Sequence, residues 1–152
     1  MLSLNFLWPQ LFTNLEIFLM QTLLVYGITT LIFFAIDMLW IGLIARSFYR
    51  EKLGFILSTE VNWPAASVFY LLYIGGILYF AVLPALREHS WQTALMQGAV
   101  LGLLCYATYD LTNMATIKNW PLVVVIVDML WGVVLTGSVA LVSYLIAAKF
   151  LG

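Results

Sequence analysis

Four long apolar stretches alternate with short polar stretches along the chain. They run over about 20–45, 64–86, 91–116 and 121–147. A helix needs roughly 20 apolar residues to cross the ~30 Å of hydrocarbon in a bilayer. The core of a soluble domain does not explain four such stretches, because too few polar residues remain to cover it. The pattern therefore predicts an all-α integral membrane protein, folded as a four-helix bundle.

Composition strengthens this prediction. Hydrophobic residues make up 64% of the chain and charged residues 9%, whereas charged residues are usually about a quarter of a soluble domain. The formal net charge of −1 gives no reason to expect nucleic acid as a partner. We expect the main partner of this chain to be the lipid bilayer.

Residues 1–19 differ from the spans, so the chain divides into this segment and a transmembrane domain over residues 20–152. No Lys or Arg precedes the apolar residues, so we expect no cleaved signal peptide. Trp8, Pro9 and Glu16 interrupt the apolar side chains, a mixture typical of a segment in the membrane interface. The alternative is an extension ahead of a natural start at Met20.

The polar turns contain helix-start signals and set the topology. Ser90 is a good N-cap for the third span, and Pro64 suits the first turn of the second. Basic residues favour the cytoplasmic side. Four of them, Arg46, Arg50, Lys52 and Lys118, lie in the loops after spans one and three, against Arg87 and Lys149 on the other side. The count predicts that both termini face away from the cytoplasm.

Two short motifs occur twice. Asn-Trp-Pro occupies residues 62–64 and 119–121, and Asp-Met-Leu-Trp occupies residues 37–40 and 128–131. Two helix pairs related by a pseudo-two-fold axis along the membrane normal would explain the repetition, as in many transporters. Coincidence or shared interface chemistry is the alternative explanation.

Several segments resemble a known family of membrane proteins. They are residues 36–42, Phe48-Tyr49, Leu53-Gly54, Asn62-Trp63, residues 69–73, residues 106–113, Val127-Asp128 and Trp131-Gly132. The most specific is residues 106–113, which contains Tyr-Asp-Leu-Thr-Asn. From residue 20 onwards the chain resembles the bacterial family catalogued as domain of unknown function 2177. The resemblance implies a multi-pass protein of the bacterial inner membrane, and it implies neither an activity nor a catalytic residue.

Three aspartates lie inside the predicted spans. Asp37 and Asp110 lie about 13 and 12 Å before the basic residues that end their spans, and Asp128 lies about 12 Å beyond Trp120, at 1.5 Å of helix per residue. All three therefore reach a similar depth, in the half of the membrane that we expect to face the cytoplasm. Charged groups at this depth almost always face the bundle interior or a cavity.

Polar and aromatic residues accompany these acids. Tyr106, Tyr109, Asp110 and Asn113 share one face of the third span, since they are spaced by three or four residues. The predicted ligand- or ion-binding pocket is lined by Asp37, Asp110, Asp128, Asn113, Tyr109, Tyr106, Tyr73, Tyr70, Trp40 and Trp131. The simplest arrangement is a single pocket that opens toward the cytoplasm.

No basic residue lies at that depth to neutralise the acids. We therefore expect that at least one aspartate is protonated or that the aspartates share a cation. A metal site of carboxylates, Asn113 and water is a further alternative, although the spacing matches no known motif. The structural alternative is that the polar side chains only hydrogen-bond the helices to each other, at ~0.6 kcal/mol per contact.

Other residues have simpler interpretations. Trp63, Trp91 and Trp120 stand at span ends, where tryptophan anchors helices in the interface. The glycine pairs Gly98/Gly102 and Gly75/Gly76 favour close helix packing. Cys105 is a single cysteine with no partner for a disulfide, so we interpret it as a small buried hydrophobic residue. The sequence contains no phosphate-binding loop, HExxH, CxxC or GxSxG motif, and no organic cofactor is evident.

Three functions remain open. The leading hypothesis is proton- or cation-coupled binding or transport of a small solute or lipid headgroup at the aspartates. The second is an accessory subunit or assembly factor of a larger membrane complex. The third is a membrane-embedded enzyme that modifies a lipid or isoprenoid, with an aspartate as general acid or base. A homo-oligomer is also consistent with the sequence, because four short helices rarely enclose a large pathway.

Overall fold

The chain folds into four helical segments, each long enough to cross a membrane and each called a rod below. The computed structural model describes residues 4–151 and the side chains from residue 13 onwards. The helices are α1 (Leu4–Trp40), α2 (Arg46–Leu53), α3 (Trp63–Ile77), α4 (Leu83–Glu88), α5 (Trp91–Thr116) and α6 (Leu122–Leu151), with π-helical turns η1 (Ile41–Ala45) and η2 (Leu78–Val82) between them. Four segments are long and apolar enough to cross a membrane: Thr13–Leu53, Trp63–Glu88, Trp91–Thr116 and Leu122–Leu151. This confirms the prediction of a four-helix membrane bundle.

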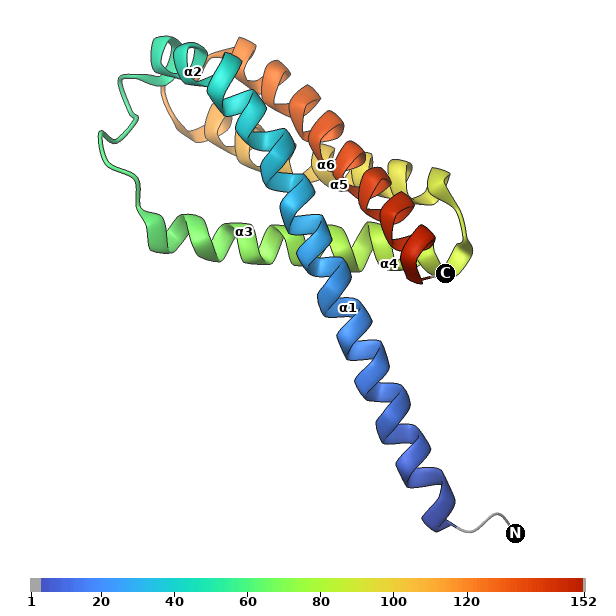
Figure 1. The fold of residues 1–152 in the computed structure, drawn as a ribbon. Helices are drawn as coiled ribbons and strands as arrows, with labels where there is room; N and C mark the ends of the chain where they lie inside the picture. Colours follow the sequence, from blue (N-terminus) through green and yellow to red (C-terminus); the bar gives the residue numbers. More distant parts are fainter. Residues whose placement is uncertain (1–3, 152) are drawn as a thin grey trace.

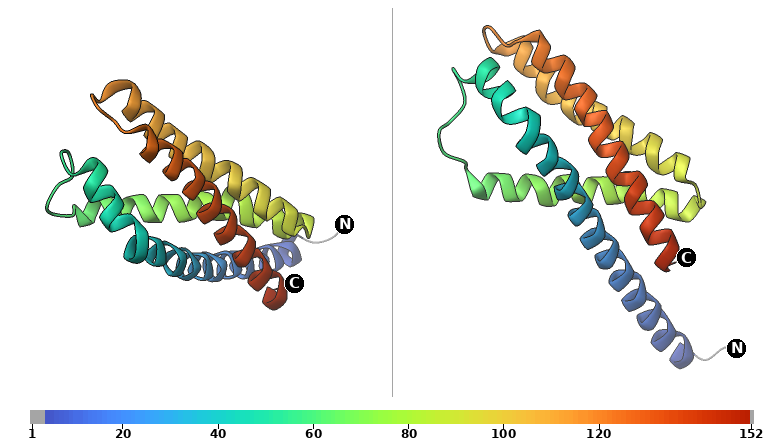
Figure 2. Two further views of the ribbon diagram at one scale, coloured as in Figure 1. Left: turned by 90° about the horizontal axis from the view of Figure 1, so that it is seen from above. Right: turned by 45° about the horizontal axis from the view of Figure 1, so that its top comes forward.

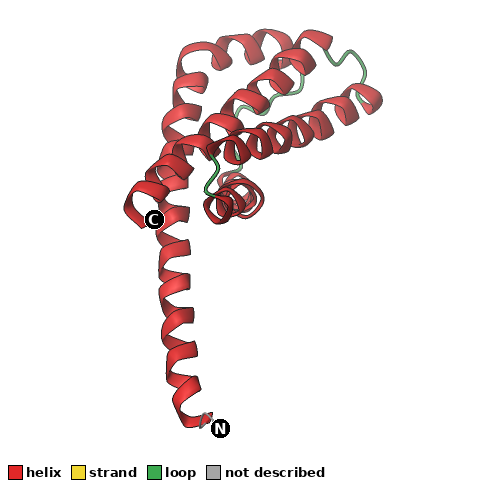
Figure 3. Cartoon of the chain, turned by 90° about the vertical axis from the view of Figure 1, so that its right-hand side faces the viewer, coloured by secondary structure: helices red, strands yellow, loops and turns green. Residues whose placement is uncertain are grey.

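The first rod is longer than predicted and changes direction. The helix does not end at Ala45, where the charged stretch begins, but continues through η1 into α2. The chain turns at η1 and α2 leaves the axis of α1 (Figures 2 and 3). Sharp bends of this kind are common at π-helical turns. Because of this turn, Leu53, Phe48 and Tyr49 on α2 pack over Trp120 and the start of α6.

Residues 4–19 continue α1 without a break, and this part of α1 projects beyond the other helices (Figure 1). Residues 1–3 lie outside the described part of the chain, as do the side chains up to residue 12. Whether residues 1–19 lie in the membrane interface therefore stays a prediction.

The second rod runs from α3 through η2 into α4. The Asn62 side chain caps α3 by accepting a hydrogen bond from the Ala65 N–H at 3.1 Å, and Pro64 occupies the first turn, as predicted. The π-helical turn η2 immediately precedes α4, which has Pro84 in its first turn. Proline lacks an N–H and disturbs the preceding helical turn.

The third and fourth rods, α5 and α6, pack closely side by side. Ser90 caps α5 as predicted, because its hydroxyl accepts a hydrogen bond from the Thr93 N–H at 3.2 Å. A methyl group added to Gly102 would lie 1.9 Å from the Gly132 carbonyl oxygen, and one added to Gly98 would lie 2.8 Å from the Thr136 carbonyl oxygen. Glycine at these two positions therefore allows the two backbones to approach, which confirms the predicted role of the Gly98/Gly102 pair.

The Gly75/Gly76 pair does not lie at a close contact between helices, in contrast to the prediction for it. A methyl group added to Gly75 would only touch Tyr26 at 3.9 Å, and one added to Gly76 would meet nothing within 4 Å. The expectation of close packing at these two glycines is therefore wrong, because no neighbouring backbone approaches this part of α3.

The second rod crosses α1 and diverges from the α5–α6 pair toward the start of α3 (Figures 1 and 2). The largest cluster of buried side chains lies where the rods meet. Its members come from α1, α3, η2 and α6, and include Phe33, Ile74, Ile77, Val82, Leu135 and Val139. The rods are thus held together over the middle and one end, and they separate near the beginning of α3.

The repeated motifs do not occupy equivalent positions. Asn62 has a φ of −79° and caps α3, whereas Asn119 has a φ of 62° in the turn before α6. The two Asp-Met-Leu-Trp copies lie on α1 and α6, which run antiparallel (Figure 1). An axis along the membrane normal would relate parallel helices. The Asn-Trp-Pro pair opens the parallel helices α3 and α6, although with different backbone conformations, whereas the Asp-Met-Leu-Trp pair does not fit such an axis.

Candidate functional site

Three buried aspartates form the centre of the candidate site. Asp37 is 6% exposed, Asp110 is 0% exposed and Asp128 is 7% exposed. Each comes from a different rod, namely α1, α5 and α6. Within the described part of the chain, these are the buried residues with an ionisable carboxyl group. All three carboxyl groups therefore face the interior of the bundle rather than its surface.

Asp110 has no hydrogen-bond partner among the described residues. Both of its carboxyl oxygens are buried and unpaired, and so is the indole Nε1 of Trp120 beside it. Its charged neighbour is Asp128. A buried polar group without a partner is unfavourable, and an ionised one is more so. This arrangement is therefore costly for folding.

Asp128 has one hydrogen bond, donated by the Tyr49 hydroxyl. Tyr49 reaches it because α2 turns at η1 and covers the start of α6. The Tyr49 hydroxyl also lies close to the indole of Trp40 and to Asp110. Tyr49 thus closes the space around the Asp110–Asp128 pair from the α2 side.

Asp37 has a separate environment. Its polar neighbours are the indole of Trp131 and the hydroxyl of Tyr70. The Trp131 Nε1 is buried without forming a hydrogen bond of normal geometry. The Tyr106 hydroxyl interacts electrostatically with the carboxyl groups of Asp37 and Asp128. Asp110 and Asp128 are therefore electrostatic neighbours, whereas the nearest polar groups of Asp37 are those of Trp131 and Tyr70.

Trp40 and Trp131 stack on each other. Their ring centroids are 4.5 Å apart and their planes differ by 12°. Each tryptophan ends an Asp-Met-Leu-Trp motif, one on α1 and the other on α6. The two copies of the motif therefore meet across the interface of the first and fourth rods.

A hollow of about 350 Å³ lies between α3 and α5 and reaches Asp128 on α6. Its walls are Phe69, Tyr73, Cys105, Tyr106, Tyr109 and Asp128. Tyr73 is held by a hydrogen bond of 2.7 Å with the Thr136 hydroxyl. Tyr109 is 58% exposed and Phe69 is 50% exposed, so these two rings stand at the mouth of the hollow. The mouth opens where α3 separates from α5.

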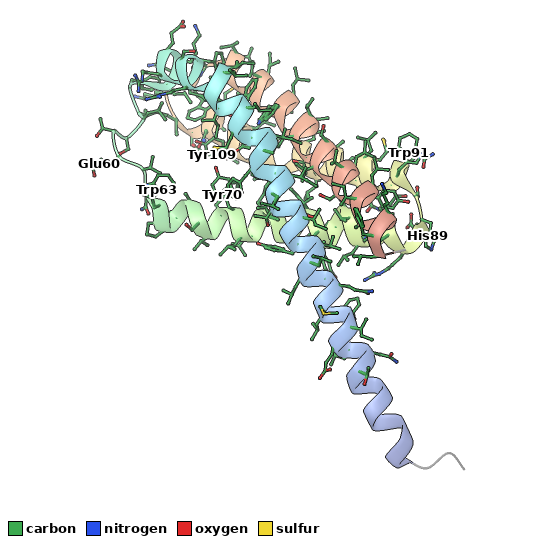
Figure 4. The ribbon with its side chains drawn as sticks, in the orientation of Figure 1. Glu60, Trp63, Tyr70, His89, Trp91 and Tyr109 are labelled. Carbon is green, nitrogen blue, oxygen red and sulfur yellow. The ribbon has the colours of Figure 1, made fainter. Side chains whose placement is uncertain are left out.

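The remaining predicted site residues lie around this hollow. Asn113 is half-buried one turn beyond Tyr109 and lies beside the Tyr109 side chain. Tyr70 lies on α3 and points toward Asp37 rather than into the hollow. Figure 4 shows Tyr70 and Tyr109 on α3 and α5, on the two sides of the space between these helices. The predicted pocket is thus divided into a hollow at Asp128 and an aromatic contact at Asp37.

A metal ion held by three protein acids does not fit this geometry. In the part of the chain that the structure describes, no three Asp, Glu, His or Cys side chains gather closely enough to hold a metal ion. The described ion pair, Lys52 with Glu51 at 2.6 Å, is formed by neighbouring residues of α2.

Two residues of this site do not stand out in the sequence. Tyr49 follows Asp37 by about 18 Å along a straight helix, beyond the predicted end of the first span. Trp120 was interpreted as an interface anchor, but it is only 7% exposed and lies beside Asp110. Its position in the short turn between the helices of Asp110 and Asp128 was the feature of the sequence that could have indicated this contact. Trp63 and Trp91, 71% and 48% exposed, have the exposure expected of anchors.

Tyr49→Phe is expected to lower the stability of the folded protein by about 2 kcal/mol, because it leaves a buried carboxyl without its hydrogen bond. The measurement is thermal unfolding of the purified protein in detergent. Tyr79→Phe is the matched control, since Tyr79 is 66% exposed on η2 and contacts Phe80 with its ring. Equal unfolding temperatures for the Tyr49 and Tyr79 variants would contradict the role of Tyr49.

Comparisons with known proteins identify a family. A family described as "Predicted membrane protein (DUF2177)" matches residues 22–145. No curated protein matches the chain, and no solved structure does. The matched residues contain every side chain assigned to the site above and most of each of the four membrane-length rods. Since the match covers most of its length, the chain belongs to the DUF2177 family of predicted membrane proteins.

Proposed function

We propose that this protein binds a small solute or lipid headgroup inside the membrane and couples the binding to a proton, or a monocation, at Asp110 and Asp128. The observation that carries the proposal is the complete burial of Asp110 with both oxygens unpaired. Intramembrane carboxyl groups of this kind mark proton relays and ion pathways in many membrane proteins. A structural role would be expected to pair the carboxyl group with a donor.

The proximity of Asp128 supports the coupling. Two neighbouring carboxyl groups do not readily ionise together, because their charges repel and neither is well solvated. A single proton or cation on the pair relieves both effects. The described residues around the pair, Tyr49, Trp40 and Trp120, are uncharged. The charge of the pair therefore depends on what is bound to it.

The hollow supports the solute-binding part of the proposal. Asp128 contributes both to the wall of the hollow and to the pair with Asp110. A solute that contacts Asp128 would change the environment of the proton or cation on the pair. In the orientation that the basic residues favour, the site would lie toward the cytoplasmic side of a bacterial inner membrane.

Asp110→Asn is expected to remove a pH dependence of stability. Ionising the unpaired carboxyl is unfavourable, so the wild-type protein should unfold at lower temperature as the pH rises and the pair loses its proton. The asparagine at position 110 cannot ionise, so the decline should be smaller in the variant, where only Asp37 and Asp128 remain as buried carboxyl groups. The difference should approach about 3 kcal/mol at high pH, the scale of inserting an aspartate at membrane depth. The measurement is thermal unfolding across pH, with and without added Na⁺ or K⁺.

The matched control is Glu60→Gln, which removes an exposed carboxyl group from the loop between α2 and α3. This variant should keep the wild-type pH profile. If Asp110→Asn and wild type instead show the same profile with and without cations, the pair does not titrate and the proposal fails.

The projecting part of α1 supports a second candidate, an accessory subunit or a homo-oligomer. Leu15, Phe18 and Met20 are 53%, 50% and 65% exposed on this part of the helix, which extends past the other rods (Figure 3). A helix from a partner or a second copy would have room to pack there. Native mass spectrometry after gentle extraction decides this candidate, and a protein released only as a monomer without partners would count against it.

A further inference from the structure

We infer that the hollow between α3 and α5 binds a lipophilic organic cation. This inference rests on the proposed function, because it names the class of solute that would occupy the same site. Three features of the hollow support it: the aromatic walls, the single acid and the position of the mouth.

Aromatic rings form most of the walls. Phe69 and Tyr73 come from α3 and stack on each other, with centroids 5.3 Å apart and planes 17° apart. Tyr106 and Tyr109 come from α5 on the opposite wall. The faces of aromatic rings attract cations, and several rings around one space are a known way to bind quaternary ammonium groups. The apolar walls also suit the hydrocarbon part of such a molecule.

Asp128 is the charged residue of these walls, and no Lys or Arg contributes to them. The basic residues near other hollows lie elsewhere: Arg46 and Arg50 line a hollow at α2, and Arg87 lines one near the end of α6. The hollow on the other side of α3, lined by Tyr26, Phe34 and Trp63 among others, has aromatic walls but no acid. Aromatic walls and a buried acid therefore coincide at Asp128, which favours a cation over a neutral or anionic solute.

The mouth of the hollow is at membrane depth. Phe69 and Tyr109 stand at it, and both lie within membrane-length helices. A solute would therefore enter from the lipid between α3 and α5 rather than from water. Molecules that concentrate there must be lipophilic, so the favoured occupant combines one positive charge with an apolar body.

Charge balance links this cation to the proton. When the Asp110–Asp128 pair has a proton, arrival of a cation at Asp128 makes the carboxylate form favourable, and the proton leaves for the solvent. The positive charge in the site is unchanged, since one cation replaces one proton. Binding should therefore strengthen as the pH rises and should release a proton.

Binding of tetraphenylphosphonium tests the inference. Its shape-matched opposite is tetraphenylborate, which is anionic. Wild-type protein in phosphatidylcholine nanodiscs should bind radiolabelled tetraphenylphosphonium saturably, more tightly at high pH, after subtraction of binding to empty nanodiscs. Asp128→Asn should weaken this binding at least tenfold, and tetraphenylborate should show no saturable binding.

Tyr109 provides a second set of variants if Asp128→Asn fails to fold. Tyr109→Leu should weaken tetraphenylphosphonium binding several-fold, whereas Tyr109→Phe keeps the ring and should weaken it less than Tyr109→Leu does. Tyr79→Leu changes an exposed tyrosine outside the hollow and should have no effect. Equal saturable binding of tetraphenylborate, or unchanged binding by both Asp128→Asn and Tyr109→Leu, would overturn the inference.

The outcome also separates this inference from the proposed function. An Asp110-dependent pH profile without saturable tetraphenylphosphonium binding would reject the organic cation and leave the titrating pair intact. Absence of both the pH profile and the binding would reject the two proposals together.

Discussion

Gly102→Ala is expected to lower the stability of the bundle by at least about 3 kcal/mol, since overpacking of this kind commonly costs 1–3 kcal/mol and here cannot be relieved easily. The added methyl group would lie 1.9 Å from the Gly132 carbonyl oxygen and 2.6 Å from its carbon. Both atoms belong to the backbone of α6, so relief requires that the two helices separate. Thermal unfolding in detergent, followed by circular dichroism, measures the loss.

Gly76→Ala is the control for this substitution. A methyl group at Gly76 meets nothing within 4 Å, and alanine is favoured over glycine in a helix by up to about 1 kcal/mol. This variant should therefore unfold at the wild-type temperature or slightly above it. If Gly102→Ala were as stable as Gly76→Ala, the close contact between α5 and α6 would be wrong.

Trp131→Ala is expected to lower the stability by about 3 kcal/mol, the lower end of the range for large aromatic residues replaced by alanine. Trp131 stacks on Trp40 and packs against the main core. Its removal takes away the ring that joins α1 to α6 and one polar neighbour of Asp37. The measurement is again the unfolding temperature of the purified variant.

A double-mutant cycle tests whether the stack itself contributes. Trp40→Ala and Trp131→Ala should be less damaging together than the sum of the single effects, by about 1 kcal/mol for a stacked aromatic pair. Trp63→Ala, at a tryptophan that is 71% exposed, should change stability little and should add to either single variant. Strict additivity of the Trp40 and Trp131 effects would show that the stack contributes nothing beyond the two separate burials.

These two contacts explain how the site is supported. The α5–α6 contact holds Asp110 and Asp128 on closely packed backbones. The stack of Trp40 on Trp131 joins the same α6 helix to α1. By contrast, the start of α3, which supplies Phe69 and Tyr73 to the hollow, diverges from α5 (Figure 2). The acid wall of the hollow is therefore the more firmly supported of its two sides.

Much of the fold follows from local properties of the sequence. The four rods were predictable because apolar length alone decides whether a helix can cross a bilayer. The cap at Ser90 was predictable because a hydroxyl in that position satisfies a free N–H of the first helical turn. The close contact at Gly102 was predictable because small residues spaced by four allow helix backbones to approach in a membrane.

The burial of Asp37, Asp110 and Asp128 was also predictable, since exposure of an aspartate to lipid is unfavourable at any rotation of the helix. Which of the three would be neighbours was not. That depends on how far each helix is rotated about its axis and on which helices touch. Neither quantity can be read from a single sequence, because the lipid and the bundle interior both favour apolar side chains.

The contact of Tyr49 with Asp128 and the hollow appear only in the folded chain, whereas the short turn at Trp120 was a signal in the sequence. Tyr49 reaches Asp128 because the chain turns at the π-helical segment Ile41–Ala45. The apolar sequence of that segment does not predict this change of direction. Trp120 lies against Asp110 because α5 and α6 are joined by a tight turn. The number of membrane helices, their approximate limits and the burial of the acids were predictable from the sequence, since these depend on local composition and spacing. Helix rotation, the turn at η1 and the divergence of α3 depend on contacts between distant residues, and only the folded chain brings those contacts together.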